Sequence, residues 1–205
     1  MDHELQAVTL SAIHEDFAHG WRAEILSARP MILPPRHFTY PGEAEEAERG
    51  ALEVLVHPGA IHPGAIHPGV EGALPFLATC AMGFADPAVP TGIWAAPNPR
   101  ELCAVSGGYA YLIDTGEPRR FAMVPYRPVL EVRAAAKPGL LLFVGHRSIF
   151  AWGSHGKAWE SPKLSDEGLT ISLVDGERLH GLGWQMMADK EAPFVLDLRT
   201  GLRTL

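Results

Sequence analysis

Three histidines recur at equal spacing in the first half of the chain. Residues 56–70 contain three copies of the pattern His-Pro-Gly, which place His57, His62 and His67 five residues apart. Pro-Gly favours a type II turn, because Pro fixes φ and Gly tolerates positive φ. Three imidazoles on successive surface turns could converge on Zn²⁺ or Ni²⁺. The competing interpretation is a loop at 57–69 lengthened by repetition, which costs little entropy and requires no cofactor.

A second group of chemically capable residues lies between positions 146 and 184. It combines three imidazoles and three indoles: His146, Trp152, His155, Trp159, His180 and Trp184. Aromatic rings with a polar tip are common ligand contacts, so these six residues form a candidate ligand-binding site. Tryptophans also fill the space between twisted sheets, and that structural interpretation stays open for each of them.

Carboxylates in the same region suggest a hydrolase-type enzyme as an alternative function. Asp166 and Glu167, and then Asp175 and Glu177, are pairs of the kind used in acid–base catalysis. Both pairs lie beside Gly in turns, where Asp commonly caps the backbone. The catalytic hypothesis requires His155, His180 and nearby carboxylates to point into one pocket.

The elements that must position these residues repeat along the second half of the chain. Val105 and Val144 are 39 residues apart in equivalent strands, as are Asp114 and Gly153. A period of about 40 residues is typical of a four-stranded propeller blade. Residues 91–205 are therefore predicted to form three units with strands at 92–96, 102–106, 109–114 and 121–126, then 129–134, 140–145, 148–153 and 157–161, then 169–174, 179–186, 193–198 and 202–205.

Residues 1–90 show a looser pattern. Strands are expected at 5–13 and 22–26, and a hairpin is expected to pair 51–56 with 75–82. The predicted fold class is thus all-β, with antiparallel meander sheets arranged as irregular propeller-like blades in one continuous domain. A β-sandwich is the alternative, since strand periodicity does not separate the two. An incomplete ring would leave a sheet face open, which predicts closure by the N-terminal segment or a homodimer.

Two short segments resemble known propeller blades. Residues 152–159, WGSHGKAW, resemble the Asp-box turn S-x-D-x-G-x-x-W of sialidase-type propellers. Gly156 and Trp159 match, whereas Ser154 stands at the Asp position and Trp152 at the first Ser position. The ending FVLDLRTGLRT, 194–204, resembles the last strands of a quinoprotein-type or WD40-like blade. Both resemblances imply fold and carry no catalytic residues.

Composition limits the possible partners. The formal net charge of −7 argues against nucleic acid, because phosphate binding needs a basic face. The longest apolar run is too short to cross a membrane, and the first residues resemble no secretory signal. Cys80 and Cys103 lie in apolar strands and are expected to be buried, reduced thiols of a cytoplasmic protein. These properties favour a binding module for an unidentified protein or small-molecule ligand.

Overall fold

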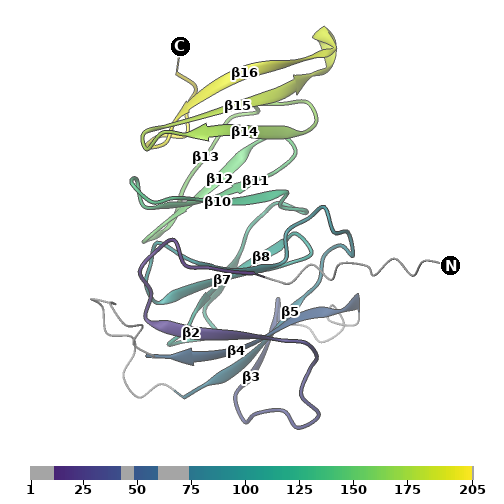
Figure 1. Cartoon of the computed structure of the whole chain (residues 1–205), viewed down its shortest axis with the longest axis vertical. Helices are drawn as coiled ribbons and strands as arrows, with labels where there is room; N and C mark the ends of the chain where they lie inside the picture. Colours follow the sequence, from purple (N-terminus) through teal and green to yellow (C-terminus); the bar gives the residue numbers. More distant parts are fainter. Residues whose placement is uncertain (1–11, 43–48, 60–73, 205) are drawn as a thin grey trace, which may run out of the picture.

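Four small β-sheets form the part of the chain that the computed structural model describes, residues 12–42, 49–59 and 74–204. The sheets stack face to face in a row, so the molecule is elongated (Figure 1). No α-helix occurs in the described residues, and the predicted all-β class is confirmed. Blades of a propeller and layers of a sandwich both pack in this way.

The first sheet contains most of the described N-terminal segment. Its strands, in spatial order, are β2 (Trp21–Leu26), β4 (Ala51–Pro58), β5 (Phe76–Ala81) and β3 (His37–Tyr40). The predicted hairpin is confirmed, with Val56 opposite Phe76 in the antiparallel pair β4–β5. The sequence did not predict β3, which pairs with β5 in parallel.

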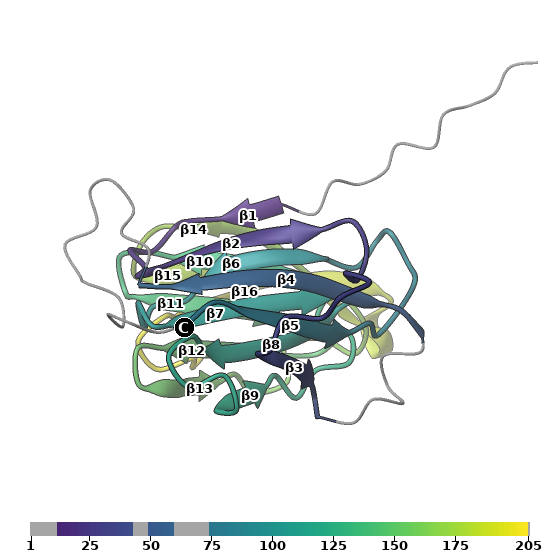
Figure 2. The ribbon, with the colours of Figure 1, turned by 90° about the horizontal axis from the view of Figure 1, so that it is seen from below.

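The second sheet combines a distant N-terminal strand with one predicted unit. Its strands are β1 (Ala12–His14), β6 (Gly92–Ala95), β7 (Glu101–Ser106), β8 (Tyr109–Asp114) and β9 (Phe121–Met123). The strand β1 pairs in parallel with β6. Seen from below, the strands of successive sheets run in similar directions, with β1 at one edge (Figure 2). The described N-terminal strand therefore extends the second sheet and does not lie beside the last one.

The third sheet has the four strands predicted for it, whereas the fourth has three strands in place of the four predicted. The third contains β10 (Glu131–Ala135), β11 (Leu140–Val144), β12 (Ile149–Gly153) and β13 (Gly156–Glu160). The fourth contains β14 (Leu169–Val174), β15 (Arg178–Gln185) and β16 (Lys190–Asp197). The predicted last strand at 202–205 is reduced, over its described residues, to one bridge between Arg203 and Leu196. The turn at Gly201, with φ of +71°, brings the chain back beside β16 for only this short contact.

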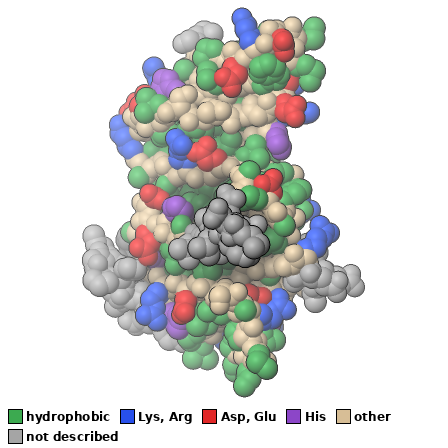
Figure 3. Space-filling view, turned by 45° about the vertical axis from the view of Figure 1, so that its right-hand side comes forward, with side chains coloured by type: hydrophobic (Ala, Val, Ile, Leu, Met, Phe, Trp, Pro, Cys, Tyr) green, Lys and Arg blue, Asp and Glu red, His purple; other side chains and the backbone are tan. Residues whose placement is uncertain are grey.

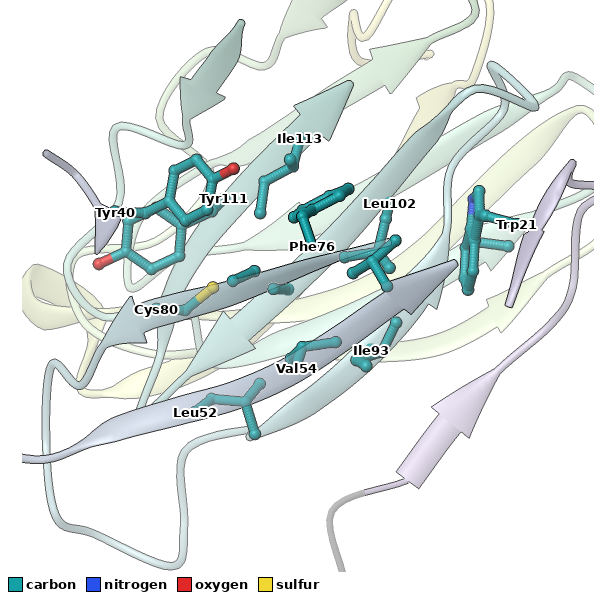
Figure 4. Close-up of a cluster of buried hydrophobic side chains, with 14 residues drawn as sticks. Trp21, Tyr40, Leu52, Val54, Phe76, Cys80, Ile93, Leu102, Tyr111 and Ile113 are labelled. Carbon is teal, nitrogen blue, oxygen red and sulfur yellow. The ribbon is translucent and has the colours of Figure 1, made fainter. Parts of the chain in front are cut away.

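Three apolar layers hold the four sheets together. Between the first and second sheets, Trp21, Leu52, Val54 and Phe76 face Ile93, Leu102, Tyr111 and Ile113 (Figure 4). The second and third sheets share a layer around Cys103, Leu112 and Phe143, and the third and fourth share one around Ile149, Trp159 and Leu196. Each middle sheet is thus apolar on both faces, which explains the near-continuous hydrophobic runs of β7, β8 and β11.

Both cysteines are free and buried, as predicted. Burial raises the pKa of the Cys80 and Cys103 thiols well above the ordinary value, so neither is an activated nucleophile. Within the described ranges, the structure contains no helix with the length and apolar content that a membrane crossing requires. On the face drawn in Figure 3, acidic and basic side chains are interspersed with hydrophobic ones along the stack.

Candidate functional site

Strand register brings two carboxylates together at the edge of the second sheet. Glu101 begins β7 and Asp114 ends β8, and the two residues are paired partners in the antiparallel ladder. Side chains two residues apart share a face, so Glu101 lies on the face of Cys103 and Asp114 on the face of Leu112. Cys103 and Leu112 belong to the layer against the third sheet. Both carboxylates therefore point toward the third sheet.

A cavity opens at this edge, between the second and third sheets. Its volume is about 400 Å³, within the usual range for small-molecule pockets. The polar and aromatic residues that line it are Asn98, Glu101, Asp114, Arg120, Phe121, Trp152, Ser154 and His155. Two of the six ligand contacts predicted from the sequence, Trp152 and His155, thus lie in one cavity with a pair of carboxylates.

Glu101 is the most perturbed acid of the cavity. The indole Nε1 of Trp152 donates a hydrogen bond to its Oε2 at 2.8 Å. Burial raises the pKa of Glu101 above the ordinary value, the Trp152 hydrogen bond lowers it, and the neighbouring Asp114 carboxylate raises it further. The raised pKa means that this carboxyl group releases its proton at higher pH than an ordinary Glu.

Asp114 differs from Glu101 in its hydrogen bonds. Its Oδ1 accepts the backbone N–H groups of Gly116 at 2.9 Å and Glu117 at 3.1 Å. The guanidinium of Arg100 lies 3.3 Å from the same oxygen. These three donors hold the Asp114 carboxylate in place. The register pair thus places an anchored carboxylate beside Glu101, whose pKa is raised.

The opposite wall of the cavity comes from the hairpin of the third sheet. Ser154 Oγ lies 2.9 Å from Nδ1 of His155 in the exposed turn between β12 and β13. Trp152, half-buried on β12, stacks on Phe150 with ring centroids 6.3 Å apart. Hydroxyl, imidazole and carboxyl groups therefore surround aromatic surface. Such a set can bind a small ligand that has several polar groups and an apolar face.

The other four predicted contacts lie away from this cavity. His146 is exposed between β11 and β12, and Trp159 is buried in the layer between the third and fourth sheets. His180 and Trp184 lie on β15, on the face opposite the buried Leu179. The Nε2 of His180 is 3.2 Å from Oδ2 of Asp175, so its partner comes from its own sheet. The catalytic hypothesis required His155 and His180 to point into one pocket. His155 lines the cavity, whereas His180 lies outside it.

The carboxylates of the predicted pairs cap turns. Asp175 Oδ1 accepts the backbone N–H of Arg178 at 2.9 Å, and this bond lowers the pKa of Asp175. Asp166 Oδ2 accepts the backbone N–H of Met186 at 2.8 Å. At the C-terminal turn, Asp197 Oδ1 accepts the N–H groups of Arg199 and Thr200. Asp175 and Asp197 thus stabilise their own turns, whereas Asp166 joins the loop before β14 to the segment after β15.

The histidine array is only partly described. His57 lies within β4, half-buried and opposite Arg22 of β2, whereas His62 and His67 fall outside the described residues. Residue 57 therefore belongs to a strand, and the predicted loop begins after it. Among the side chains that the structure describes, no group of three or more His, Cys, Asp or Glu is arranged to hold a metal ion.

Six of the eight polar and aromatic lining residues escaped the sequence reasoning, and Glu101, Asp114 and Arg120 are the charged ones among them. Each lies at the end of a strand or in the turn that follows, within segments that were assigned only a structural part. The available signal was the pair of acids at the two outer ends of the hairpin 101–114, since a tight turn at Gly107-Gly108 must place them opposite each other. No local sequence pattern indicated that Trp152 would lie beside these residues.

Comparisons with known proteins give no further guide to this site. No family model matches the chain, and no curated protein or solved structure matches it significantly. The geometry of the cavity is therefore the basis for assigning a function.

Proposed function

We propose that the protein is a blade-built binding module that binds a small saccharide in the cavity between the second and third sheets. The observation that carries this proposal is the meeting of Trp152 with the carboxyl groups of Glu101 and Asp114 around one cavity of about 400 Å³. Sugar rings combine hydroxyl groups, which both donate and accept, with an apolar face of C–H groups. The cavity offers the complement of both features.

Several polar groups support a polyhydroxylated ligand over an apolar one. Asp114 is an anchored acceptor, while Glu101, with its raised pKa, can accept or donate. Arg120 supplies donors from the edge of the cavity, and Ser154 supplies a hydroxyl group. A hydrocarbon ligand would displace water from these groups and offer no hydrogen bond in return, at a cost of roughly 1–3 kcal/mol for each group left unsatisfied.

The test is isothermal titration calorimetry of the purified protein with a panel of neutral mono- and disaccharides. Trp152→Phe removes the indole N–H and should weaken the best ligand about ten-fold or more. Trp184→Phe is the matched control, because Trp184 lies outside the cavity, and it should leave the affinity unchanged. Absence of binding across the panel, or equal losses in the two variants, would reject the proposal.

Hydrolysis of the same ligand is the second candidate function. It is favoured by one observation, the raised pKa of Glu101 beside a second carboxylate, because glycosidic bond cleavage uses a protonated acid with a carboxylate. Release of reducing sugar from disaccharides would distinguish catalysis from binding. Glu101→Gln should then abolish turnover while saccharide affinity is kept within a few-fold, and undetectable turnover in the unmodified protein would leave binding alone.

A further inference from the structure

A second cleft lies on the other side of the connection between β8 and β9. It is bounded by the residues around β3 of the first sheet and by the turn at 116–120 of the second sheet. Its volume is about 680 Å³. Three arginines line it, Arg36 from the first wall and Arg119 and Arg120 from the second. Among the described residues of the lining, His37 and one acid, Glu117, join them.

This local charge is opposite to that of the whole chain. The protein carries a formal net charge of −7, whereas the described residues that line this cleft contribute three guanidinium groups and one carboxylate. Arg119 and Arg120 are exposed, and neither guanidinium forms a salt bridge with a described residue. Three guanidinium groups on the two walls of one concave surface create a positive potential inside it.

The walls of the cleft are fixed relative to each other. The hydroxyl group of Tyr40, at the end of β3, donates a hydrogen bond to the backbone carbonyl of Pro118 at 2.7 Å. The turn is closed by the N–H of Arg120, which donates to the carbonyl of Glu117 at 2.7 Å. Asp114 Oδ1 holds its other end through the N–H of Gly116. The two exposed arginines therefore extend from a rigid backbone, which lowers the entropic cost of binding.

Arg36 is held in place from the other side. Its guanidinium donates to the backbone carbonyl of Leu74 and lies 5.9 Å from the ring centroid of Phe38 and 5.8 Å from that of Phe76. Its Nη1 is the donor in that bond, which leaves further N–H groups of the fork for a ligand. An arginine fixed by stacking is better suited to recognise planar or tetrahedral oxyanions than a flexible lysine.

His37 belongs to a polar chain that continues beneath the first sheet. Its Nε2 lies 2.8 Å from Oγ1 of Thr79, and that hydroxyl group donates to Oε2 of the buried Glu53 at 2.6 Å. Because the hydroxyl proton is used by Glu53, the Nε2 of His37 must be the donor to Thr79. Arg29 pairs with the other oxygen of Glu53 at 2.7 Å. This chain fixes the orientation of the imidazole at the edge of the cleft.

From this arrangement we propose that the cleft is a binding site for the phosphate group of a small molecule. A carboxylate has two oxygens and is satisfied by one arginine fork, whereas a phosphate group offers more acceptors and a larger charge to donors on two walls. The site goes beyond the saccharide cavity, although Arg120 lines both. The proposed phosphate site does not require a saccharide in the other cavity.

The test titrates the full chain with inorganic phosphate at constant ionic strength and follows the side-chain Nε–H signals of the arginines by NMR. Saturable shifts at Arg119 and Arg120, with one site, are expected. Arg119→Gln should weaken binding about ten-fold, the effect of one charge-assisted hydrogen bond at an exposed site. The matched control is Arg178→Gln, an exposed arginine on β15, which should change the affinity less than two-fold.

A substitution of opposite sign sharpens the test. Glu117→Gln removes the one acid in the lining and should strengthen phosphate binding, while Glu191→Gln on the distant β16 should not. Glycerol phosphate distinguishes the source: equal affinity indicates a phosphate ester as the ligand, and its exclusion indicates free phosphate. The proposal is overturned by shifts that do not saturate, by equal effects of the site and control variants, or by acetate binding as tightly as phosphate.

Discussion

The two faces of the third sheet each carry a tryptophan, and the sheet uses them differently. Trp152 faces the second sheet, half-buried, and donates to the carboxylate of Glu101 at 2.8 Å. Trp159 faces the fourth sheet, is 8% exposed, and donates to the backbone carbonyl of Leu198 at 2.7 Å. A buried carbonyl requires a permanent partner, whereas a carboxyl group at a cavity can exchange partners. The comparison indicates that one face stabilises the stack, and the other faces the cavity in which we propose saccharide binding.

Loss of Trp159 should have the largest effect. Trp159→Ala removes a buried indole and leaves the Leu198 carbonyl without a partner, so the free energy of unfolding should fall by about 3–5 kcal/mol. Chemical denaturation followed by circular dichroism measures this change. Trp152→Ala, at the half-buried position, should cost less than half as much. Equal losses would mean that the two faces do not differ in this way.

Two glycines beside the tryptophans test the same difference through the backbone. A Cβ added at Gly201 would lie 2.5 Å from the Trp159 ring, and Gly201 has φ of +71°. A Cβ added at Gly156 would meet Trp152 only at 3.9 Å, with φ of +109°. Gly201→Ala should therefore destabilise by about 2–4 kcal/mol, from strain and overpacking, and Gly156→Ala by about 1–2 kcal/mol, from strain alone. Thermal unfolding of the two variants measures these losses. A larger loss for Gly156→Ala than for Gly201→Ala would contradict the expected difference between the two faces.

The strands of the stack were easier to predict from the sequence than the residues that meet at the cavity. Alternation and turn residues predicted β6 to β13 to within a few residues, because these strands are consecutive along the chain and pair with their neighbours. The parallel pairings of β1 with β6 and of β3 with β5 were not predicted, since they join segments more than 35 residues apart. Trp152 and His155 were predicted as contacts, but their meeting with Glu101 depends on how two sheets stack. Local patterns carry no information on that stacking.

Replacing Trp152 conservatively should change the cavity more than the fold. Trp152→Phe keeps an aromatic ring and removes the N–H that lowers the pKa of Glu101, so this pKa should rise further. The stability loss should be about 1–2 kcal/mol, for one hydrogen bond to a charged group at a half-buried site. Carboxyl carbon NMR during a pH titration measures the pKa. An unchanged or lower pKa of Glu101 in the variant would show that the hydrogen bond does not tune the site.

The smallest expected effect concerns the pH dependence of stability. Because the folded-state pKa of Glu101 is raised, the protonated carboxyl stabilises the fold below the unfolded-state pKa, and this contribution is lost as pH rises through the folded value. Glu101→Gln should thus be more stable than the unmodified protein near neutral pH, by less than about 1 kcal/mol after screening by solvent. The difference should disappear in acid. Denaturant midpoints measured across pH, with Glu191→Gln as the control, test this prediction. A Glu101→Gln variant that is less stable than the unmodified protein at neutral pH would contradict it.

The most direct test of the central claim follows the indole N–H signals of the five tryptophans in a ¹H–¹⁵N NMR spectrum, assigned by Trp→Phe variants. The protein is titrated with the tightest saccharide of the panel. We predict a saturable shift of the Trp152 signal, whose N–H bonds to Glu101 in the cavity, and a Trp159 signal that stays in place. A Trp152 signal that is unmoved at saturation, or a larger shift at Trp159, would contradict the assignment of binding to one face of the third sheet and stability to the other.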